Sequence, residues 1–222
     1  MLKRAGAAIA VLFLFASISF GQDNHYDASV NGAAVFTKQS EGNGVTQSGT
    51  VGMNVFGTFR LRVKPKHSLL FNYGRAKNSQ VYQAGDNFHV LTTISEYSGA
   101  YVYSPFRKGK FEPFVLAGGG ALRFSPRSTW VFFPPLPPSN LPNNVLADVG
   151  AMTQTEIAFL YGLGVDYQLP VYPKFALRLQ YRGFLYREPD FHVTTGIGKP
   201  LSFFTGAYGH MAEPAIGLVF RF

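Results

Sequence analysis

Hydrophobic and polar residues alternate one by one along most of this chain, which is the pattern of a β-strand with two unlike faces. Turn-forming or polar stretches separate the alternating segments, so each reads as one strand. The eight segments are residues 27–36, 49–64, 68–75, 88–104, 111–124, 154–169, 175–187 and 209–222. The alternation therefore predicts an all-β fold with eight strands.

In these segments one face is apolar, and the other is mostly small or polar with a few charges. The pattern is clearest over residues 49–64, where the apolar face consists of Val51, Met53, Val55, Gly57, Phe59, Leu61 and Val63. In the fourth segment, Tyr97, Tyr101 and Tyr103 share one face, and we expect them outside, near lipid headgroups. In the fifth segment we expect the outward residues to be Phe114, Leu116, Leu122 and Phe124.

Short and long connections alternate between the segments. Short turns contain Pro65, Pro105 and Pro170, and the long polar connections are residues 37–48, 76–87, 125–153 and 188–208. An even strand count with this alternation is typical of outer-membrane barrels, whose short turns are periplasmic and whose long loops are extracellular. A sheet that faces lipid must also close on itself to pair every backbone group. The sequence therefore predicts an eight-stranded antiparallel up-and-down transmembrane β-barrel.

The first 21 residues have the anatomy of a cleaved signal peptide. Lys3 and Arg4 precede an uncharged run over residues 5–20, and Gly21 offers a small residue for cleavage. The run is shorter than the roughly 20 residues that a transmembrane helix needs. We therefore expect residues 1–21 to be removed and residues 22–222 to form one barrel domain. The chain has no cysteine, so we expect neither a lipoprotein anchor nor disulfides.

Composition agrees with a chain that is solvated by lipid. Charged residues make up 14% of the chain and aromatic residues 16%, and there are 24 glycines. The formal net charge of +8 comes from dispersed basic residues, so we expect no nucleic-acid partner. The basic residues at the short turns either meet inner-leaflet headgroups or are ordinary solvated charges; they are Lys64, Lys66, Arg107, Lys108, Lys110 and Lys174.

Charges of both signs recur on the face opposite the apolar one. We expect them to form an ion-pair network in a narrow lumen, with the members Arg60, Arg62, Glu96, Glu156, Asp166, Arg178, Arg182 and Glu213. An eight-stranded barrel has an interior just wide enough for side chains. The alternative is a soluble, lipocalin-like carrier with its apolar face inside. Its outer face would then contact water and should be rich in Lys, Glu and Asp.

Several stretches together resemble the small eight-stranded outer-membrane barrels, namely the OmpA-like and OmpW-like porin-type domains. These stretches are the signal peptide, the glycine-bearing residues 113–124, residues 176–186, and the alternating terminal strand over residues 216–222. The resemblance implies that the barrel-assembly machinery recognises the carboxy-terminal strand through Ile216, Leu218, Phe220 and Phe222. It further implies an outer-membrane location with periplasmic termini, contact with outer-membrane lipids, and an extracellular ligand for the long loops.

Catalytic motifs are weak. The chain contains neither a His-Glu-x-x-His zinc pattern nor a Gly-x-Ser-x-Gly elbow. Some eight-stranded barrels are lipid A deacylases with a His-x-Ser pair, and the nearest match here is His192-Val193-Thr194. We therefore expect no enzyme, no cofactor and no metal. A structural or surface-interaction barrel is the leading hypothesis, followed by a narrow pore for small or apolar solutes, and then by a lipid-modifying enzyme.

Two further motifs have a structural and a functional interpretation. The triple glycine at residues 118–120 is not followed by the Lys-Ser or Lys-Thr of a phosphate loop, so we expect a tightly curved wall. The proline-rich residues 134–138 predict either a preformed polyproline surface for a partner or simply a stiffened loop.

Overall fold

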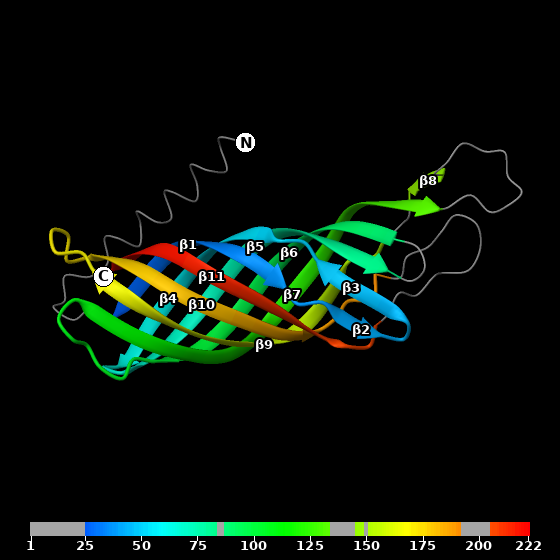
Figure 1. Cartoon of the computed structure of the whole chain (residues 1–222). Helices are drawn as coiled ribbons and strands as arrows, with labels where there is room; N and C mark the ends of the chain where they lie inside the picture. Colours follow the sequence, from blue (N-terminus) through cyan, green and yellow to red (C-terminus); the bar gives the residue numbers. More distant parts are fainter. Residues whose placement is uncertain (1–24, 84–86, 134–144, 149–150, 192–204) are drawn as a thin grey trace, which may run out of the picture.

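Eight long antiparallel strands form a closed barrel in the computed structural model (Figure 1), which describes residues 25–83, 87–133, 145–148, 151–191 and 205–222. The strands are β1 (Tyr26–Thr37), β4 (Gly52–Lys64), β5 (His67–Gln83), β6 (Asn87–Tyr103), β7 (Phe111–Phe133), β9 (Gln154–Gln168), β10 (Phe175–Arg187) and β11 (Tyr208–Arg221). Each long strand pairs with the next one along the chain, and β1 pairs with β11, which closes the ring. The prediction of an all-β, eight-stranded, up-and-down barrel is confirmed.

The two ends of the barrel differ. Three short turns and both ends of the described chain lie at one end, which we call the terminal end (Figure 1). The opposite end, the loop end, carries the hairpin of β2 (Ser40–Gly42) and β3 (Val45–Gly49) and the short strand β8 (Val145–Asp148). Asn43 and Gly44 join β2 to β3 with φ of 51° and 75°, as a tight hairpin turn requires. The predicted signal peptide, residues 1–21, falls outside the described residues. In the part of the chain that is described, no helix is long and apolar enough to cross a membrane.

The strands extend further towards the loop end than predicted. The expected loop at residues 76–87 is wrong, because β5 continues to Gln83, where it pairs with Asn87 of β6. The expected irregular stretch at residues 125–153 is also wrong in part, because β7 continues to Phe133 and pairs with β8. Within residues 37–48, β2 and most of β3 replace part of the expected loop. These parts pair through their backbones without a regular alternation, since residues 77–80 are all polar and residues 130–133 are all apolar, so hydrophobic alternation could not reveal them.

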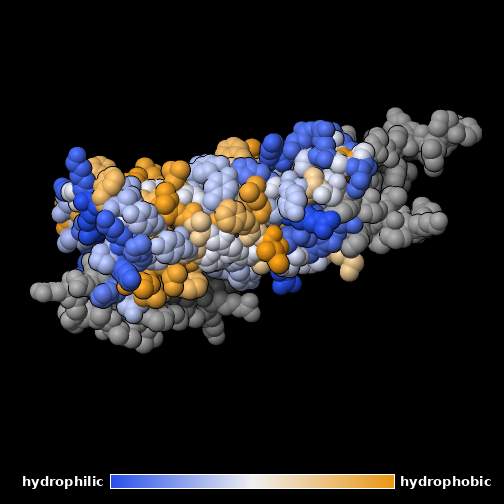
Figure 2. Space-filling view, turned by 90° about the horizontal axis from the view of Figure 1, so that it is seen from below, coloured by the Kyte–Doolittle hydropathy of each residue, from blue (hydrophilic) through white to orange (hydrophobic). Residues whose placement is uncertain are grey.

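Apolar side chains cover the outside of the wall. Met53 and Ile157 are 77% and 86% exposed, although both are large and hydrophobic. Figure 2 shows hydrophobic side chains gathered in the middle of one face, between hydrophilic zones towards the two ends. The rings of Tyr73 and Tyr97 lie 5.1 Å apart, tilted by 47°, on the loop-end side of this band, as expected where a membrane meets water. The predicted outward face of residues 49–64 is confirmed.

The predicted faces of β7 are wrong. Phe114, Leu116, Leu122 and Phe124 are buried inside the barrel, whereas Phe111 and Val115 are exposed. Both faces of this strand carry apolar residues, so its own alternation does not choose between them. Pairing with β9 decides the matter, because it sets Phe114 opposite Gly164, whose missing side chain leaves room for the ring.

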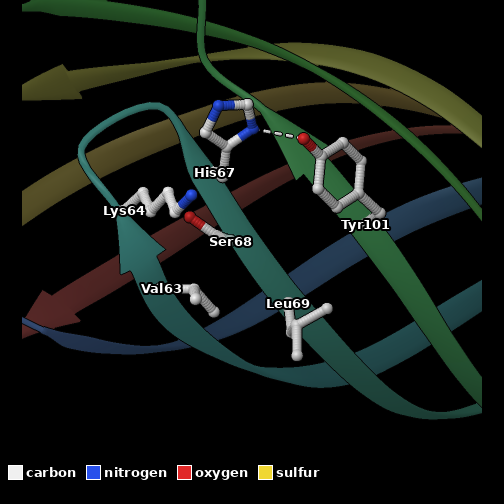
Figure 3. A pocket seen from close by; sticks show the side chains of 6 residues that line it. All are labelled: Val63, Lys64, His67, Ser68, Leu69 and Tyr101. Atoms are coloured by element: carbon white, nitrogen blue, oxygen red, sulfur yellow. Dashed lines mark hydrogen bonds between the residues drawn. The ribbon is translucent and has the colours of Figure 1, made fainter.

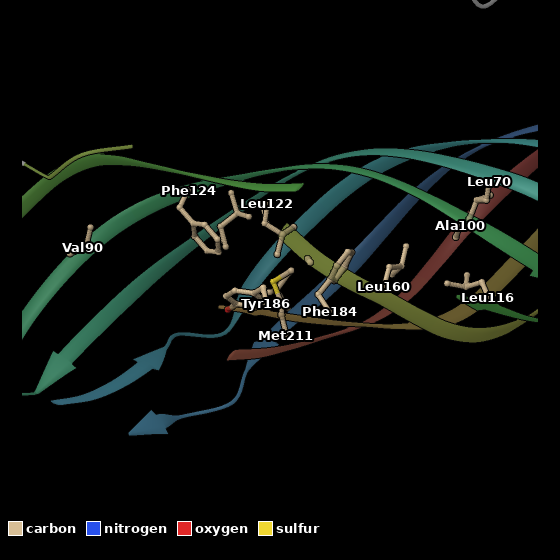
Figure 4. Packing of buried hydrophobic residues seen from close by; sticks show 14 of the residues in the cluster. Leu70, Val90, Ala100, Leu116, Leu122, Phe124, Leu160, Phe184, Tyr186 and Met211 are labelled. Atoms are coloured by element: carbon tan, nitrogen blue, oxygen red, sulfur yellow. The ribbon is translucent and has the colours of Figure 1, made fainter. Parts of the chain in front are cut away.

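The interior holds apolar side chains along its length and charged ones mainly towards the terminal end. Aromatic and aliphatic side chains from β5, β6, β7, β9, β10 and β11 belong to one buried cluster (Figure 4). Phe124 and Tyr186 lie 5.5 Å apart in this cluster, and Phe191 contacts Phe124 edge-on. Towards the terminal end, buried arginines and carboxylates lie among apolar side chains such as Leu70, Val102 and Leu116.

Candidate functional site in the barrel interior

Asp166 of β9 is the centre of a buried charge cluster near the terminal end. Arg178 of β10 donates from Nε and Nη2 to the two oxygens of Asp166, at 2.7 and 2.9 Å. Arg60 of β4 and Arg221 of β11 each donate to Asp166 Oδ2 at 3.4 Å. All four residues are essentially inaccessible to solvent. One carboxylate therefore joins strands on opposite parts of the wall through three guanidinium groups.

Two more carboxylates complete this terminal-end cluster. Asp27 of β1 lies 3.4 Å from Arg178 Nη2 and 3.6 Å from Arg62 Nη2. Glu112 of β7 lies 3.1 Å from both Arg62 Nη1 and Arg221 Nη2. Arg107 is half-exposed and belongs to the turn between β6 and β7. Its Nη2 lies 3.0 Å from Glu112 Oε2. Guanidinium groups thus outnumber carboxylates here, and each carboxylate has at least three cationic neighbours.

A second cluster, at mid-barrel, has the opposite imbalance. Arg182 of β10 donates to both oxygens of Glu96 on β6, at 3.0 and 2.9 Å, and also contacts Glu213 of β11. Asn54 of β4 donates to the other oxygen of Glu213 at 2.9 Å. Ser98 donates to Glu96 at 2.7 Å. One guanidinium therefore serves two buried carboxylates, and neutral donors supply the remaining hydrogen bonds.

Phenylalanine rings stack on the guanidinium groups. Arg182 lies 3.6 Å from the centroid of Phe56, and Arg60 and Arg178 lie 4.7 and 5.3 Å from that of Phe114. A guanidinium held over a ring is stabilised by the ring quadrupole without needing water. Four arginines are among the largest fully buried side chains of the described chain. The two clusters and their rings therefore occupy the barrel axis with side chains.

The clusters bring together seven of the eight residues expected in the lumen. Those in the terminal-end cluster are Arg60, Arg62, Asp166 and Arg178, and those at mid-barrel are Glu96, Arg182 and Glu213. Glu156 is not brought into either cluster, because it lies near the loop end with Arg187 and Glu188 as its electrostatic neighbours.

Sequence reasoning missed Asp27, Glu112 and Arg221 as members. Asp27 and Arg221 follow the inward alternation of β1 and β11, so the signal was present at the strand ends. Glu112 was hidden by the inverted faces of β7, because it shares its face with Phe114.

A smaller polar group lies at the loop end. Glu188, directly after β10, accepts a hydrogen bond of 2.7 Å from Gln47 of β3, which also contacts Gln80 of β5 at 3.3 Å. Glu188 is only 2% exposed. Burial raises its pKa to about 7, although hydrogen bonds from neighbouring side chains oppose the shift. This carboxyl therefore changes charge near neutral pH, and it ties the β2–β3 hairpin to the end of β10.

Histidines and acidic residues form no catalytic arrangement that we recognise in the described parts. No group of three His, Asp or Glu residues is placed there to hold a metal ion. His67 contacts Tyr101, and His210 lies 2.7 Å from the hydroxyl of Tyr161, on the outside of the wall. The residues of the nearest deacylase-like motif, 192–194, lie outside the described residues, as do the prolines at 134–138.

The outer wall has a depression of about 420 Å³ at the terminal end (Figure 3). Apolar and polar side chains of β4, β5 and β6 line it: Val63, Lys64, His67, Ser68, Leu69 and Tyr101. Lys64 is one of the turn lysines for which contact with inner-leaflet headgroups is expected.

The carboxy-terminal residues lie along the seam where the barrel closes. Ile216 and Leu218 are exposed on the outer face of β11, and Phe220 stacks on Phe222 at 5.7 Å. The backbone of Phe222 exchanges two hydrogen bonds with Tyr26, at 3.1 and 3.0 Å. Recognition of these residues by the assembly machinery stays a prediction.

Comparison with known proteins adds the fold family. No protein-family model and no curated protein matches the chain. Among solved structures, it is similar to Neisserial surface protein A, at 17% identity over 89% of this chain and 97% of that chain, with a TM-score of 0.51. The chain has the fold of outer-membrane β-barrels. The outer-membrane protease OmpT from Escherichia coli aligns at 9% identity over 93% and 99% of the two chains, with a TM-score of 0.50. The outer membrane protein OprG from Pseudomonas aeruginosa follows at 12% identity, 90% and 97% coverage, and a TM-score of 0.49. At identities this low, structural similarity shows the fold alone and leaves the activity open.

Proposed function

We propose that this protein is an integral outer-membrane barrel with a structural or surface-interaction role. The observation that carries the proposal is the filled axis, where fully buried arginines, carboxylates and phenylalanines take the place of a water-filled lumen. A barrel whose interior is occupied in this way acts through its outer wall and its loops. The exposed apolar band, with Met53 and Ile157 as examples, supports a lipid environment.

The proposed orientation puts the terminal end in the periplasm and the loop end outside the cell. Short turns at one end and long, strand-rich connections at the other support it, since outer-membrane barrels show this asymmetry. The extracellular part then includes the β2–β3 hairpin, β8 and the loop-end halves of β5 and β7. These elements form the surface that we expect to meet an extracellular ligand.

A narrow pore is the second candidate, because charged and polar side chains line part of the interior. Conduction would require a continuous path past Arg60, Arg178 and Arg182, all of which are fully buried. A soluble lipocalin-like carrier does not fit, because the apolar face points outward. Nothing in the described residues favours an enzyme.

Gel mobility of the protein in outer-membrane fractions, with and without boiling, tests the first part of the proposal. We expect a shift on boiling, because a closed barrel resists detergent until it is heated. A protein without a shift, recovered from the soluble periplasm, would contradict the membrane location.

Planar-bilayer recording of the same preparation tests the second part. We expect no steady conductance from the wild type, because buried side chains fill the axis. Steady unitary currents that change in Arg178→Ala would replace the structural role with the narrow pore.

A further inference from the structure

Four exposed basic side chains lie on the outer wall in its loop-end half. Arg75 and Lys77 belong to β5, and Arg123 and Arg127 belong to β7. We call these four residues the basic patch. The two strands lie on either side of β6 (Figure 1), so the patch spans three adjacent strands.

Strand register places the basic residues of β5 and those of β7 at the same level along the barrel axis. Arg75 pairs with Ser95 of β6, and Ser95 pairs with Arg123 of β7. Neighbouring strands lie about 4.8 Å apart, so the backbones of Arg75 and Arg123 are about 10 Å apart. Lys77 occupies the next outward position of β5, opposite Thr93. Two basic ridges thus flank a strip of small hydroxyl side chains on β6.

A β-bulge places the fourth basic residue. Leu91 of β6 pairs with Ser128 of β7 while Thr92 pairs with Pro126, which leaves Arg127 as the extra residue. Bulges of this kind re-aim side chains. Arg127 and Lys77 line the same depression of about 290 Å³ in the outer wall. One basic residue from each of the two strands therefore lines the hollow.

The side wall of this hollow is fixed by hydrogen bonds. Thr50 exchanges two bonds with the backbone of Ser79, at 2.9 and 3.1 Å, and contacts Asn78 at 3.3 Å. The hollow is also lined by hydroxyl and amide groups, namely those of Thr50, Asn78, Ser79, Thr92 and Thr93. Thr50, Asn78 and Thr92 already use their side chains in hydrogen bonds within the protein, so Lys77 and Arg127 are the charged groups that the hollow offers to a ligand.

The patch stands directly beyond the aromatic rim. Tyr73 and Tyr97, whose rings contact one another, form the outward pair of β5 and β6 that precedes the pair Arg75 and Ser95. No acidic residue stands in the outward rows from Tyr73 to Ser79 on β5 or in the positions facing them on β6 and β7. The positive charge therefore lies at headgroup height, immediately outside the apolar band, where it is not neutralised by the wall.

We propose that the basic patch binds an outer-leaflet lipid whose headgroup carries at least two phosphates. Two phosphates match two basic ridges about 10 Å apart, and arginine binds phosphate through two parallel hydrogen bonds. The inference rests on the proposed function, because the leaflet follows from the orientation of the barrel. The position beside the tyrosines favours a lipid over a soluble polyanion, which would be bound by the loop tips as readily as by the wall.

Native mass spectrometry of the folded protein in detergent tests the proposal with diphosphoryl lipid A as the probe. We expect the wild type to retain this lipid more strongly than the same lipid without phosphates. Arg123→Gln combined with Arg127→Gln should weaken retention about 25-fold, because each charge near an anionic headgroup contributes about fivefold. Lys108→Gln with Lys174→Gln is the matched control, since it removes two exposed charges from the opposite end. It should change retention less than about twofold.

Three results would overturn the inference. Equal weakening by the two double variants would mean general attraction between a basic protein and an anionic lipid. Unchanged retention in the double arginine variant would mean that the patch does not touch the lipid. Displacement of the lipid by inorganic phosphate or by a sulfated polysaccharide at low concentration would assign the patch to a soluble anion.

The boiling shift, measured on the same samples, separates the two proposals. A wild type that shifts on boiling but shows no preference for the phosphorylated lipid contradicts only the lipid site. A wild type without a shift contradicts the membrane barrel itself. Variants that keep the wild-type shift are folded, so their lipid retention reports binding alone.

Discussion

Individual charges in the interior are not equivalent, because their numbers of partners differ. Asp166 accepts hydrogen bonds from Arg60, Arg178 and Arg221, all of them buried. Glu213 shares the single guanidinium of Arg182 with a second carboxylate. Removing a buried charge is costly when it leaves opposite charges unpaired, and mild when it relieves an excess of like charge.

Asp166→Asn should destabilise the barrel by about 3 to 5 kcal/mol, because three buried guanidinium groups lose a shared counter-charge. Glu213→Gln is the matched control, and we expect it to cost only about 0.5 to 1.5 kcal/mol because Arg182 keeps both bonds to Glu96. Urea unfolding in phospholipid vesicles, followed by circular dichroism, measures both. Equal losses in the two variants would mean that the count of partners does not govern stability here.

Glu188 gives the protein a pH dependence of defined sign. Burial raises its pKa to about 7, whereas an unfolded glutamate titrates near 4.3. The folded chain therefore binds more protons than the unfolded chain between these two values, and stability falls as pH rises through this window. Glu188→Gln should remove this loss of stability with rising pH. The free energy of unfolding of the variant, relative to that of the wild type, should therefore increase by up to about 3 kcal/mol between pH 4 and pH 8.

Urea unfolding across that pH range is the measurement for Glu188. Glu41→Gln is the control, because Glu41 is an exposed carboxylate on the same hairpin. A wild-type stability that rises from pH 5 to pH 8, with Glu188→Gln parallel to it, would mean that the carboxyl is not the titrating group.

At the scale of a single element, β7 shows how a neighbouring strand sets local geometry. Side chains built at Gly118 and Gly120 would lie 2.1 and 2.3 Å from the carbonyl oxygens of Gly99 and Tyr97 on β6. One built at Gly119 would meet nothing closer than 3.4 Å. The wall therefore leaves no room at the two inward glycines, which gives the triple glycine a structural reason.

Gly120→Ala should destabilise the protein by about 1 to 3 kcal/mol, because the new methyl group would displace the backbone of β6. Gly119→Ala should leave stability unchanged or raise it by up to about 1 kcal/mol, since alanine restricts the unfolded chain. Midpoints of unfolding in urea compare the two variants. Similar losses at both positions would show that glycine is needed for strand formation rather than for close approach.

At the scale of the whole molecule, closure depends on the seam between β1 and β11. Phe222 closes the last rung by pairing with Tyr26, and its ring lies 5.9 Å from the tyrosine ring. Phe175 is another aromatic residue at this rim, in contact with Phe220 at 5.2 Å, but it belongs to β10. Comparing Phe222 with Phe175 separates packing at the rim from a signal carried by the last strand.

Phe222→Ala should lower the amount of folded protein in the outer membrane several-fold while refolding into detergent in vitro stays close to normal. The expected reason is that the assembly machinery reads the carboxy-terminal strand, whereas refolding depends on the backbone ladder. Heat-shifted protein in membrane fractions and in refolding mixtures measures the two. A similar loss in Phe175→Ala would attribute the effect to rim packing instead.

Much of the architecture was readable from the sequence because a lipid-facing barrel imposes a period of two on every strand. That period predicted the strand count and the outward face of residues 49–64, and the prolines between the segments predicted the turns at Pro65, Pro105 and Pro170. The period also predicted seven members of the interior clusters, because a charged residue on the same strand face as small residues points away from lipid. Sequence alone thereby determined the fold class and the two faces wherever those faces differ in polarity.

Tertiary structure decided what alternation cannot encode. Pairing with Gly164 turned Phe114 inward, although both faces of β7 are apolar. Backbone ladders carried β5 and β7 beyond their predicted ends, where the sequence shows no regular alternation. Only that extension brings Lys77 and Arg127, 50 positions apart in the sequence, into one hollow. Period-two reasoning describes each strand separately, whereas register and closure are properties of pairs of strands and of the ring.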